Sequence, residues 1–171
     1  IATGATPKRL GVPGEDEYWG KGITTCAVCD GAFYKDKKVV VVGGGDTAME
    51  DAAFLKKFTN DITIVQILDH LTASKAMQHK VVNDPDIDII YNSTISQFEG
   101  DGDRLKKVTI ENKETGESQE REVEGAFIAI GLSPNTEPFK GQVEMDEWGY
   151  IKAYDNTKTN IKGVFVAGDA H

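Results

Sequence analysis

Two cysteines separated by two residues are the side chains of this sequence best suited to redox chemistry. Cys26 and Cys29 are its only cysteines, and this spacing lets two sulfur atoms close a small ring. A zinc site would need further ligands, but His70, His79 and His171 form no closely spaced pair. Two cysteines also cannot form the disulfide framework of a small secreted scaffold in a chain of this length. The spacing therefore favours a redox-active pair, with two ordinary neighbouring thiols as the alternative.

A glycine-rich turn is the second feature with chemical potential. Gly43, Gly45 and Ala48 match the pattern G-x-G-x-x-G/A of dinucleotide-binding turns. Gly43 allows the tight turn, Gly45 lets a pyrophosphate approach the backbone, and Ala48 lets the next helix lie close to the sheet. The first amides of that helix then bind the anion. We expect nucleotide binding here; a glycine turn without a ligand is the alternative.

The residue that reads the adenosine ribose is expected at the end of the following strand. An acidic residue there favours NAD, whereas arginine favours the 2′-phosphate of NADP. No arginine lies near Gln66, Ile67 or Leu68, and Asp69 lies slightly beyond the usual position. Asp69 is either a ribose ligand or a solvent-exposed turn residue.

The elements that must position these residues follow an α/β pattern. Val39–Val42 predicts a strand buried on both faces, as in a parallel sheet. Residues 46–58 predict a helix that buries Ala48, Ala52, Leu55 and Phe58. Further predicted elements are strands at Ile62–Ile67, Ile87–Tyr91, Ala126–Ile130 and Gly163–Asp169, a helix at Ala73–Val82, a turn at Ser133–Asn135, and an antiparallel meander of Thr94–Phe98, Leu105–Ile110 and Glu120–Glu124.

Length and charge restrict the possible partners. The chain has 171 residues and a net charge of −9, which argues against non-specific nucleic-acid binding because an acidic chain repels phosphates. Its longest aliphatic run, Val39–Val42, is too short to span a membrane. Ile1–Gly4 lacks the character of a signal peptide. We expect a cytoplasmic protein with no membrane or nucleic-acid partner.

Several longer segments match one known family in order along the chain. They are Ala2–Gly4, Thr25–Tyr34, Val41–Ala52, Phe127–Asn135 and Gly163–Ala170. In these segments the sequence resembles the central part of the low-molecular-weight thioredoxin reductases, flavoproteins of the pyridine nucleotide-disulfide oxidoreductase family. The resemblance covers essentially the whole chain. It implies a Rossmann-like, three-layer FAD/NAD(P)-binding fold with a parallel sheet, helices and a three-stranded antiparallel meander.

The resemblance implies an electron path from a nicotinamide nucleotide through FAD to a Cys26–Cys29 disulfide, and on to thioredoxin or a thioredoxin-like protein. In that path Cys29 lies next to the flavin and Cys26 attacks the thioredoxin disulfide. Asp30 is implied as the general acid that protonates the departing thiolate, because such exchange needs a nearby proton donor. A turn or helix-capping role is the alternative for Asp30.

Cofactor contacts are also implied. Gly168 and Asp169 would contact the ribityl-phosphate side of FAD, and Gly131 would close over the nicotinamide nucleotide. The candidate nucleotide-binding residues are Gly43, Gly44, Gly45, Asp46, Thr47, Ala48, Glu50, Gln66, Asp69, Ile130 and Gly131. No metal ligands are expected.

One departure from the family concerns the nucleotide. Its NADPH-specific members carry His-Arg-Arg after the second strand and a further arginine, where this sequence has Gln66, Ile67, Leu68 and Thr72. Isoleucine and leucine cannot replace guanidinium contacts to a phosphate. The sequence therefore does not support the family's usual preference for NADPH, and NADH or another reductant is an alternative electron donor.

The other departure concerns domain organisation, because the family's N-terminal FAD fingerprint is missing. We expect residues 1–22 to be a Gly- and Pro-rich crossover from a FAD domain, 23–160 to form the NAD(P)H-binding domain, and 161–171 to begin the return. FAD would be held largely by the missing domain, so the isolated chain is expected to be inactive. The full-length protein is expected to be a homodimer.

Two alternatives to a thioredoxin reductase remain open. One is a reductase of another disulfide partner, such as a peroxiredoxin-system protein. The other is a non-catalytic nucleotide-binding fragment or redox sensor.

Overall fold

The computed structural model describes all residues from Ile1 to His171 and divides them into two compact units. The larger unit is Arg9–Ile130, and the smaller unit combines Ile1–Lys8 with Gly131–His171. The domain boundaries predicted from the sequence, at 22/23 and 160/161, stay a prediction. The assignment of the terminal segments to a FAD domain stays a prediction.

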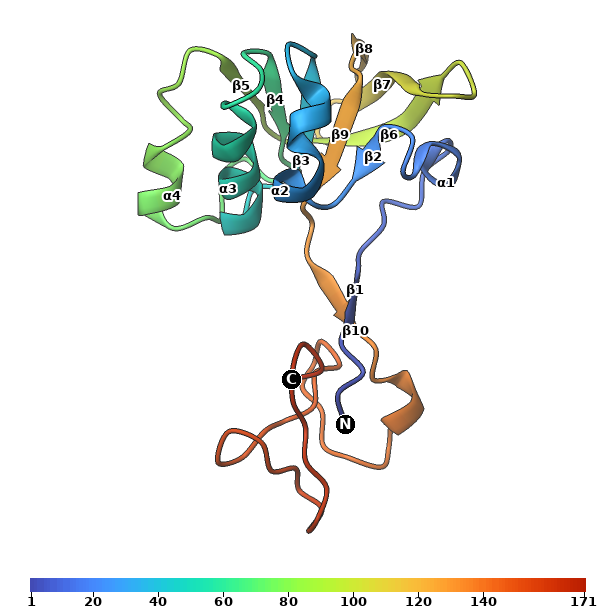
Figure 1. Cartoon of the computed structure of the whole chain (residues 1–171), viewed down its shortest axis with the longest axis vertical. Helices are drawn as coiled ribbons and strands as arrows, with labels where there is room; N and C mark the ends of the chain where they lie inside the picture. Colours follow the sequence, from blue (N-terminus) through green and yellow to red (C-terminus); the bar gives the residue numbers. More distant parts are fainter. The chain divides into compact units, whose positions relative to one another are not determined.

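A five-stranded sheet forms the centre of the larger unit, and all its neighbouring strands run parallel (Figure 1). The order is β2-β9-β3-β4-β5. The strands are β2 (Ile23–Thr24), β3 (Val39–Val42), β4 (Ile62–Val65), β5 (Ile87–Ile90) and β9 (Gly125–Ile128). Every residue of β3, β4 and β9 is buried, as expected for central parallel strands covered on both faces.

Helices cover one face of this sheet. They are α2 (Ala27–Asp30), the 3₁₀ turn η1 (Gly31–Tyr34), α3 (Asp46–Leu55) and α4 (Lys75–His79), while α1 (Glu15–Tyr18) lies in the segment expected to be only a connection. Ala48, Ala52 and Leu55 of α3 are fully buried against the sheet, as predicted. The helix ends before Phe58, the fourth residue of the predicted stripe, which is only partly buried. Helix α4 is shorter than the predicted Ala73–Val82.

A three-stranded antiparallel sheet supplies the other layer. Its strands are β6 (Ser93–Gly100), β7 (Leu105–Asn112) and β8 (Ser118–Glu122), in that order. Phe98, Val108 and Ile110 of this sheet share a second core with Val40 and Val42 of the parallel sheet. Helices, parallel sheet and antiparallel meander therefore form the three layers that the sequence predicted.

The smaller unit has little regular structure. Strand β1 (Ala5–Pro7) pairs antiparallel with β10 (Leu132–Pro134), and the 3₁₀ turn η2 (Glu137–Phe139) follows. The turn predicted at Ser133–Asn135 was wrong, because Ser133 pairs with Thr6, a partner too distant in sequence for local turn signals to reveal.

The strand predicted at Gly163–Asp169 is also not formed. Phe165 makes a single bridge to Lys158, whereas the amide of Val166 bonds to Thr157 and that of Ala167 to Ile1. Because these acceptors lie on separate segments, no continuous ladder results.

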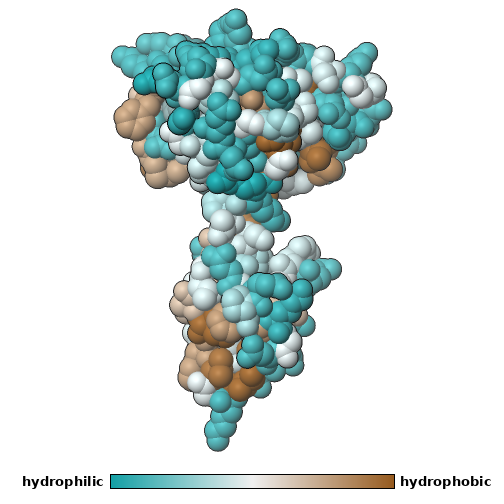
Figure 2. All heavy atoms as spheres, turned by 90° about the vertical axis from the view of Figure 1, so that its right-hand side faces the viewer, coloured by the Kyte–Doolittle hydropathy of each residue, from teal (hydrophilic) through white to brown (hydrophobic).

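The surface differs between the two units. On the face presented in Figure 2, the larger unit is mostly hydrophilic, in keeping with the exposed polar strand β8. The smaller unit buries only a small apolar cluster that includes Ile151 and Val166, and it exposes large side chains such as Trp148 and Phe165. Across the whole chain, no helix combines the length and apolar character needed to cross a membrane.

Truncating a residue of the central sheet tests this arrangement. Ile64 is fully buried, whereas Ile67, just beyond the same strand, is 57% exposed. Ile64→Ala should lower the free energy of unfolding by about 2–5 kcal/mol because it leaves a cavity. Ile67→Ala, the matched control, should change it by less than about 0.5 kcal/mol. Urea denaturation of both variants measures the difference, and equal effects would contradict the assigned strand boundary.

Candidate functional site

The carboxyl ends of the parallel strands gather the predicted functional segments at one edge of the sheet. Thr24 ends β2 two residues before Cys26, Val42 ends β3 immediately before Gly43, and Val65 ends β4 before Gln66. Parallel strands point their carboxyl ends to the same edge, which is where α/β folds bind ligands. The cysteine pair and the glycine turn therefore belong to one edge of one unit.

The two cysteines form a disulfide at the start of α2. Cys26 is the residue that caps this short helix, and its sulfur accepts a hydrogen bond of 3.1 Å from the amide of Cys29. Cys29 is exposed and Cys26 is partly buried. An amide aimed at a sulfur stabilises negative charge there, which favours a thiolate on Cys26 once the bond is reduced.

A short chain of hydrogen bonds holds Asp30 beside this turn. The hydroxyl of Thr24 donates to a carboxylate oxygen of Asp30 at 2.5 Å and accepts from the amide of Cys26 at 3.3 Å. The carboxyl group is thereby tied to the backbone of the residue that carries the capping sulfur.

Asp51 supports the same turn from α3. Its side chain is only 8% exposed, and its Oδ2 atom has no hydrogen-bond partner. Burial, together with the negative charge of nearby Glu50, raises the pKa of Asp51 to about 6, although a hydrogen bond from the amide of Ala27 opposes this rise. A buried carboxyl group therefore faces the first residue of α2.

The glycine turn has the space that a dinucleotide phosphate requires. At Gly43 (φ 133°) a Cβ would overlap the carbonyl of Ala129, so only glycine fits there. At Gly45 a Cβ would meet only the hydroxyl of Thr72 at 3.8 Å, which leaves the approach to α3 open. No side chain caps α3, so its first amides remain available to an anion. These residues fit a nucleotide pyrophosphate.

The loop after β4 folds back over this turn without presenting a cation. Gln66 is 4% exposed, and its amide group donates to the carbonyl of His70 at 2.9 Å and accepts from the amide of Ile67 at 3.1 Å. A Cβ on Gly44 would overlap the amide group of Gln66. Asp69 is exposed and pairs with the His70 ring, which lowers the pKa of Asp69.

The other predicted nucleotide- and flavin-binding residues differ in burial and in the unit to which they belong. Ala48 is buried beneath the turn, 3.5 Å from the Cβ position of Gly43, whereas Thr47 and Glu50 are exposed. Asp46 is also exposed, and its carboxylate accepts from the amide of Ser74 at 2.7 Å. Ile130 ends the larger unit, while the smaller unit contains Gly131, Gly168 and Asp169.

Three side chains near the cysteine turn escaped the sequence analysis. Thr24 and Asp51 carried no motif, although a threonine two residues before a helix cap is a known local hydrogen-bonding signal. Tyr34 lay within a matched segment, but the position of its ring depends on packing against the sheet: the ring contacts that of Phe127 edge-on, with 5.2 Å between the two centroids.

Comparison with known proteins identifies one family over the full chain. The model of the family described as pyridine nucleotide-disulphide oxidoreductase matches residues 1–171. Thioredoxin reductase of Streptomyces clavuligerus is 48% identical over 170 residues, which are 99% of this chain and 52% of that protein. The thioredoxin reductase of Dictyostelium discoideum is 48% identical over 172 residues, covering 99% and 54%. The chain thus spans about half the length of the curated relatives it matches.

Solved structures agree with this similarity. The crystal structure of Lactococcus lactis thioredoxin reductase in the FR conformation matches with a TM-score of 0.91 and 39% identity, covering 99% of this chain and 56% of that one. Thioredoxin reductase from Giardia duodenalis matches with a TM-score of 0.82 and 45% identity, over the same shares of the two chains.

The buried carboxyl group makes a pH-dependent prediction. Because the pKa of Asp51 is raised to about 6, the folded state keeps its proton where the unfolded chain has already lost it. The associated stability is therefore fully present below about pH 4 and is lost as the pH rises through about 6. Asp51→Asn retains an acceptor for the amide of Ala27 and cannot ionise.

We expect Asp51→Asn to be more stable than the wild type by about 2–3 kcal/mol above pH 7, with the advantage vanishing near pH 4. Urea denaturation over this pH range measures the difference. Glu50→Gln, a neutralised exposed residue on the same helix, is the matched control and should show no comparable advantage. A stability gain for Asp51→Asn that does not vary with pH would contradict the assignment.

Proposed function

Because the chain belongs to the pyridine nucleotide-disulphide oxidoreductase family, we propose that it forms the nucleotide-binding and redox-dithiol part of a flavin-dependent thioredoxin reductase. The observation that carries this proposal is the Cys26–Cys29 disulfide at the edge of the sheet where the glycine turn lies. Relatives named thioredoxin reductase match 99% of the chain. The activity, substrates and partners of the complete protein are proposed on this basis.

Two cofactors are proposed for the complete protein. A nicotinamide nucleotide binds at Gly43–Ala48, and FAD, held largely by a further domain, contacts Gly168 and Asp169. When bound, these groups supply the two electrons that convert the Cys26–Cys29 disulfide to a dithiol. The glycine turn contributes its amides to phosphate binding. Because the side chain of Ala48 is small and buried, α3 lies close enough to the sheet for those amides to reach the phosphate.

The dithiol then reduces a protein disulfide by exchange. The Cys26 thiolate attacks one sulfur of the thioredoxin disulfide, forms a mixed disulfide and releases a thiolate of the partner. Cys29 attacks the sulfur of Cys26 next, which re-forms the internal disulfide and releases the second partner thiolate. The hydrogen bond from the Cys29 amide to the Cys26 sulfur supports Cys26 as the attacking residue.

Asp30 is proposed to supply and accept the protons of this exchange. Its carboxyl group is oriented by the Thr24 hydroxyl, so it can return a proton to the departing thiolate without a search through side-chain rotamers. Asp51 acts from the opposite side only through the backbone of Ala27 and is a positioning residue.

The preferred nucleotide is proposed to lack a 2′-phosphate. Ile67 and Leu68 are exposed apolar side chains where a phosphate clamp would be needed, and Gln66 is fully engaged with the backbone. His70, the only basic side chain of this loop, already pairs with Asp69. These observations favour NADH, or another electron donor, over NADPH.

The proposed assembly follows the family. Thioredoxin or a thioredoxin-like protein is the disulfide partner, the full-length protein is a homodimer, and it acts in the cytoplasm. Exposed Trp148 and Phe165 of the smaller unit are consistent with further protein covering that surface. A peroxiredoxin-system protein is the second candidate for the disulfide partner, because the cysteine turn alone does not distinguish them.

Trapping experiments test the roles of the cysteines. Mixing Cys29→Ser with oxidised thioredoxin should accumulate a covalent complex, because Cys26 can attack but no thiol remains to resolve the product. Cys26→Ser should accumulate far less of this complex. Non-reducing gels and mass spectrometry identify the linked residues. A complex formed only by Cys26→Ser would reverse the two roles, and no complex with either variant would refute the proposed exchange.

Nucleotide binding is tested by thermal shift and titration calorimetry with NADH and NADPH. We expect NADH to raise the melting temperature and NADPH to bind less than tenfold more tightly, a limit of about 1.4 kcal/mol. Gly45→Ala should fold normally but lose binding, since its Cβ enters only the open approach to α3. Absence of any shift with both nucleotides would overturn the nucleotide site, and a stronger NADPH preference would overturn the argument from the missing cations.

A further inference from the structure

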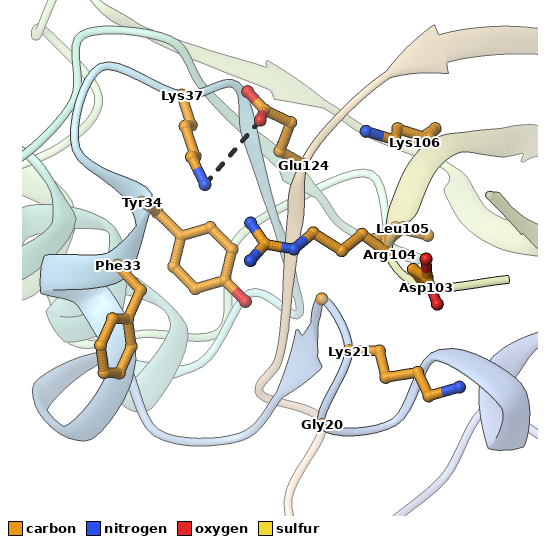
Figure 3. Close-up of a pocket in the computed structure, with 11 residues that line it drawn as sticks. Gly20, Lys21, Phe33, Tyr34, Lys37, Asp103, Arg104, Leu105, Lys106 and Glu124 are labelled. Atoms are coloured by element: carbon orange, nitrogen blue, oxygen red, sulfur yellow. Dashed lines mark ion pairs between the residues drawn. The ribbon is translucent and has the colours of Figure 1, made fainter. Parts of the chain in front are cut away.

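A pocket of about 340 Å³ in the larger unit carries positive charge in an otherwise acidic chain (Figure 3). Its lining includes four basic residues and two acidic residues: Lys21, Lys37, Arg104, Lys106, Asp103 and Glu124. Phe33 and Tyr34 of η1, the turn that directly follows the cysteine helix α2, line it as well. The electrostatic balance of this pocket is therefore opposite to that of the whole chain.

Arg104 is the unpaired cation of this pocket. The lysines have partners: Lys37 pairs with Glu124 at 3.8 Å, and Lys21 donates to the carbonyl of Gly102 at 3.0 Å. The Arg104 guanidinium makes no hydrogen bond or ion pair, although its backbone amide is fixed by Asp101 at 2.9 Å. The guanidinium of Arg104 is therefore exposed and has no protein partner, and Figure 3 shows it extending across the pocket toward Tyr34.

Tyr34 supplies a second free donor on the opposite wall. Its ring is held by Phe127 at 5.2 Å and by Gly125, where a Cβ would contact the ring. Its hydroxyl makes no hydrogen bond, and burial together with Asp30 raises the pKa of Tyr34 despite the opposing charge of Arg104. The hydroxyl therefore remains protonated and can donate at neutral pH.

We propose that this pocket binds a carboxylate side chain of the disulfide-containing partner protein, between the guanidinium of Arg104 and the hydroxyl of Tyr34. A guanidinium and a phenol are both donors, and a carboxylate is an acceptor with enough oxygens to satisfy the two together. The inference deepens the proposed thiol–disulfide exchange and rests on it.

The surface between the disulfide and the pocket suits a partner protein that carries such a carboxylate. Exposed Cys29 lies four residues before Phe33, which is itself 73% exposed, and Val28 between the cysteines is 72% exposed. An apolar surface thus lies beside the reactive sulfur atoms, and the charged pocket adjoins it through Phe33 and Tyr34. The partner is expected to carry an apolar rim next to its disulfide and an acidic residue beyond that rim.

The test uses the chain itself, without cofactors. The protein is reduced with dithiothreitol, desalted and mixed with peptides that contain one internal Cys-x-x-Cys disulfide flanked by Glu, Gln or Lys residues. In each reaction the protein dithiol becomes a disulfide and the peptide disulfide becomes a dithiol, so electrons and protons balance. Alkylation and mass spectrometry measure the rate of exchange at neutral pH.

At low ionic strength the wild type should oxidise about three to ten times faster with the Glu peptide than with the Gln peptide. Arg104→Gln should remove this preference, and Arg104→Glu should transfer it to the Lys peptide. Tyr34→Phe keeps the ring and should reduce the preference only in part. High salt should weaken it in the wild type.

Lys80→Glu is the matched control, because Lys80 is an exposed lysine of the same unit outside the pocket. If it changes the Glu preference as much as Arg104→Glu does, the effect is one of net charge and the pocket assignment fails. Equal rates with all peptides would likewise overturn the pocket. No exchange with any peptide would instead overturn the redox role of Cys26 and Cys29, on which the pocket depends.

Discussion

Parallel pairing of β9 with both β2 and β3 is the interaction on which the candidate site depends. Ile23 and Thr24 align with Ala126 and Phe127, and the latter two align with Val40 and Val41. Because strand polarity is shared, the chain leaves β2 toward Cys26 and leaves β3 toward Gly43 at the same edge of the sheet. A hydrogen-bond ladder with no chemistry of its own thus brings a redox turn and a phosphate-binding turn into one unit.

The redox turn depends on tertiary contacts for its conformation. A helix as short as α2 has no stability of its own in water. Ala27 is fully buried, and Gly31 lies close enough to α3 that a Cβ would stand 3.3 Å from Leu55 and Phe58. Asp51 adds a hydrogen bond to the amide of Ala27 at the expense of a buried oxygen without a partner. Burying such a group disfavours folding, so the fold sacrifices stability where it anchors the cysteine turn.

Net charge alone would have hidden the electrostatic pattern of the larger unit. The chain carries −9 overall, yet the pocket beside η1 presents an unpaired guanidinium at Arg104, whereas the loop at Gln66 presents no free cation to a nucleotide. Both features are local, and both depend on which side chains have partners. Lys37 and Arg104 carry the same charge in the sequence, but only the structure shows that Lys37 is neutralised by Glu124.

The sequence by itself determined the parallel strands, the antiparallel meander and the segments that carry chemistry, because burial periodicity, Gly43–Ala48 and the cysteine spacing are local patterns. The arrangement in three layers came from the resemblance to a known family. Contacts between distant residues decided the rest. Ser133 lies in a strand because it pairs with Thr6. Gly163–Asp169 forms no strand because no continuous partner strand lies beside it. Thr24 reached Asp30, Asp51 met Ala27, and Arg104 faced Tyr34 only after folding. Such pairings follow from the path of the backbone in space, which no local window of sequence contains.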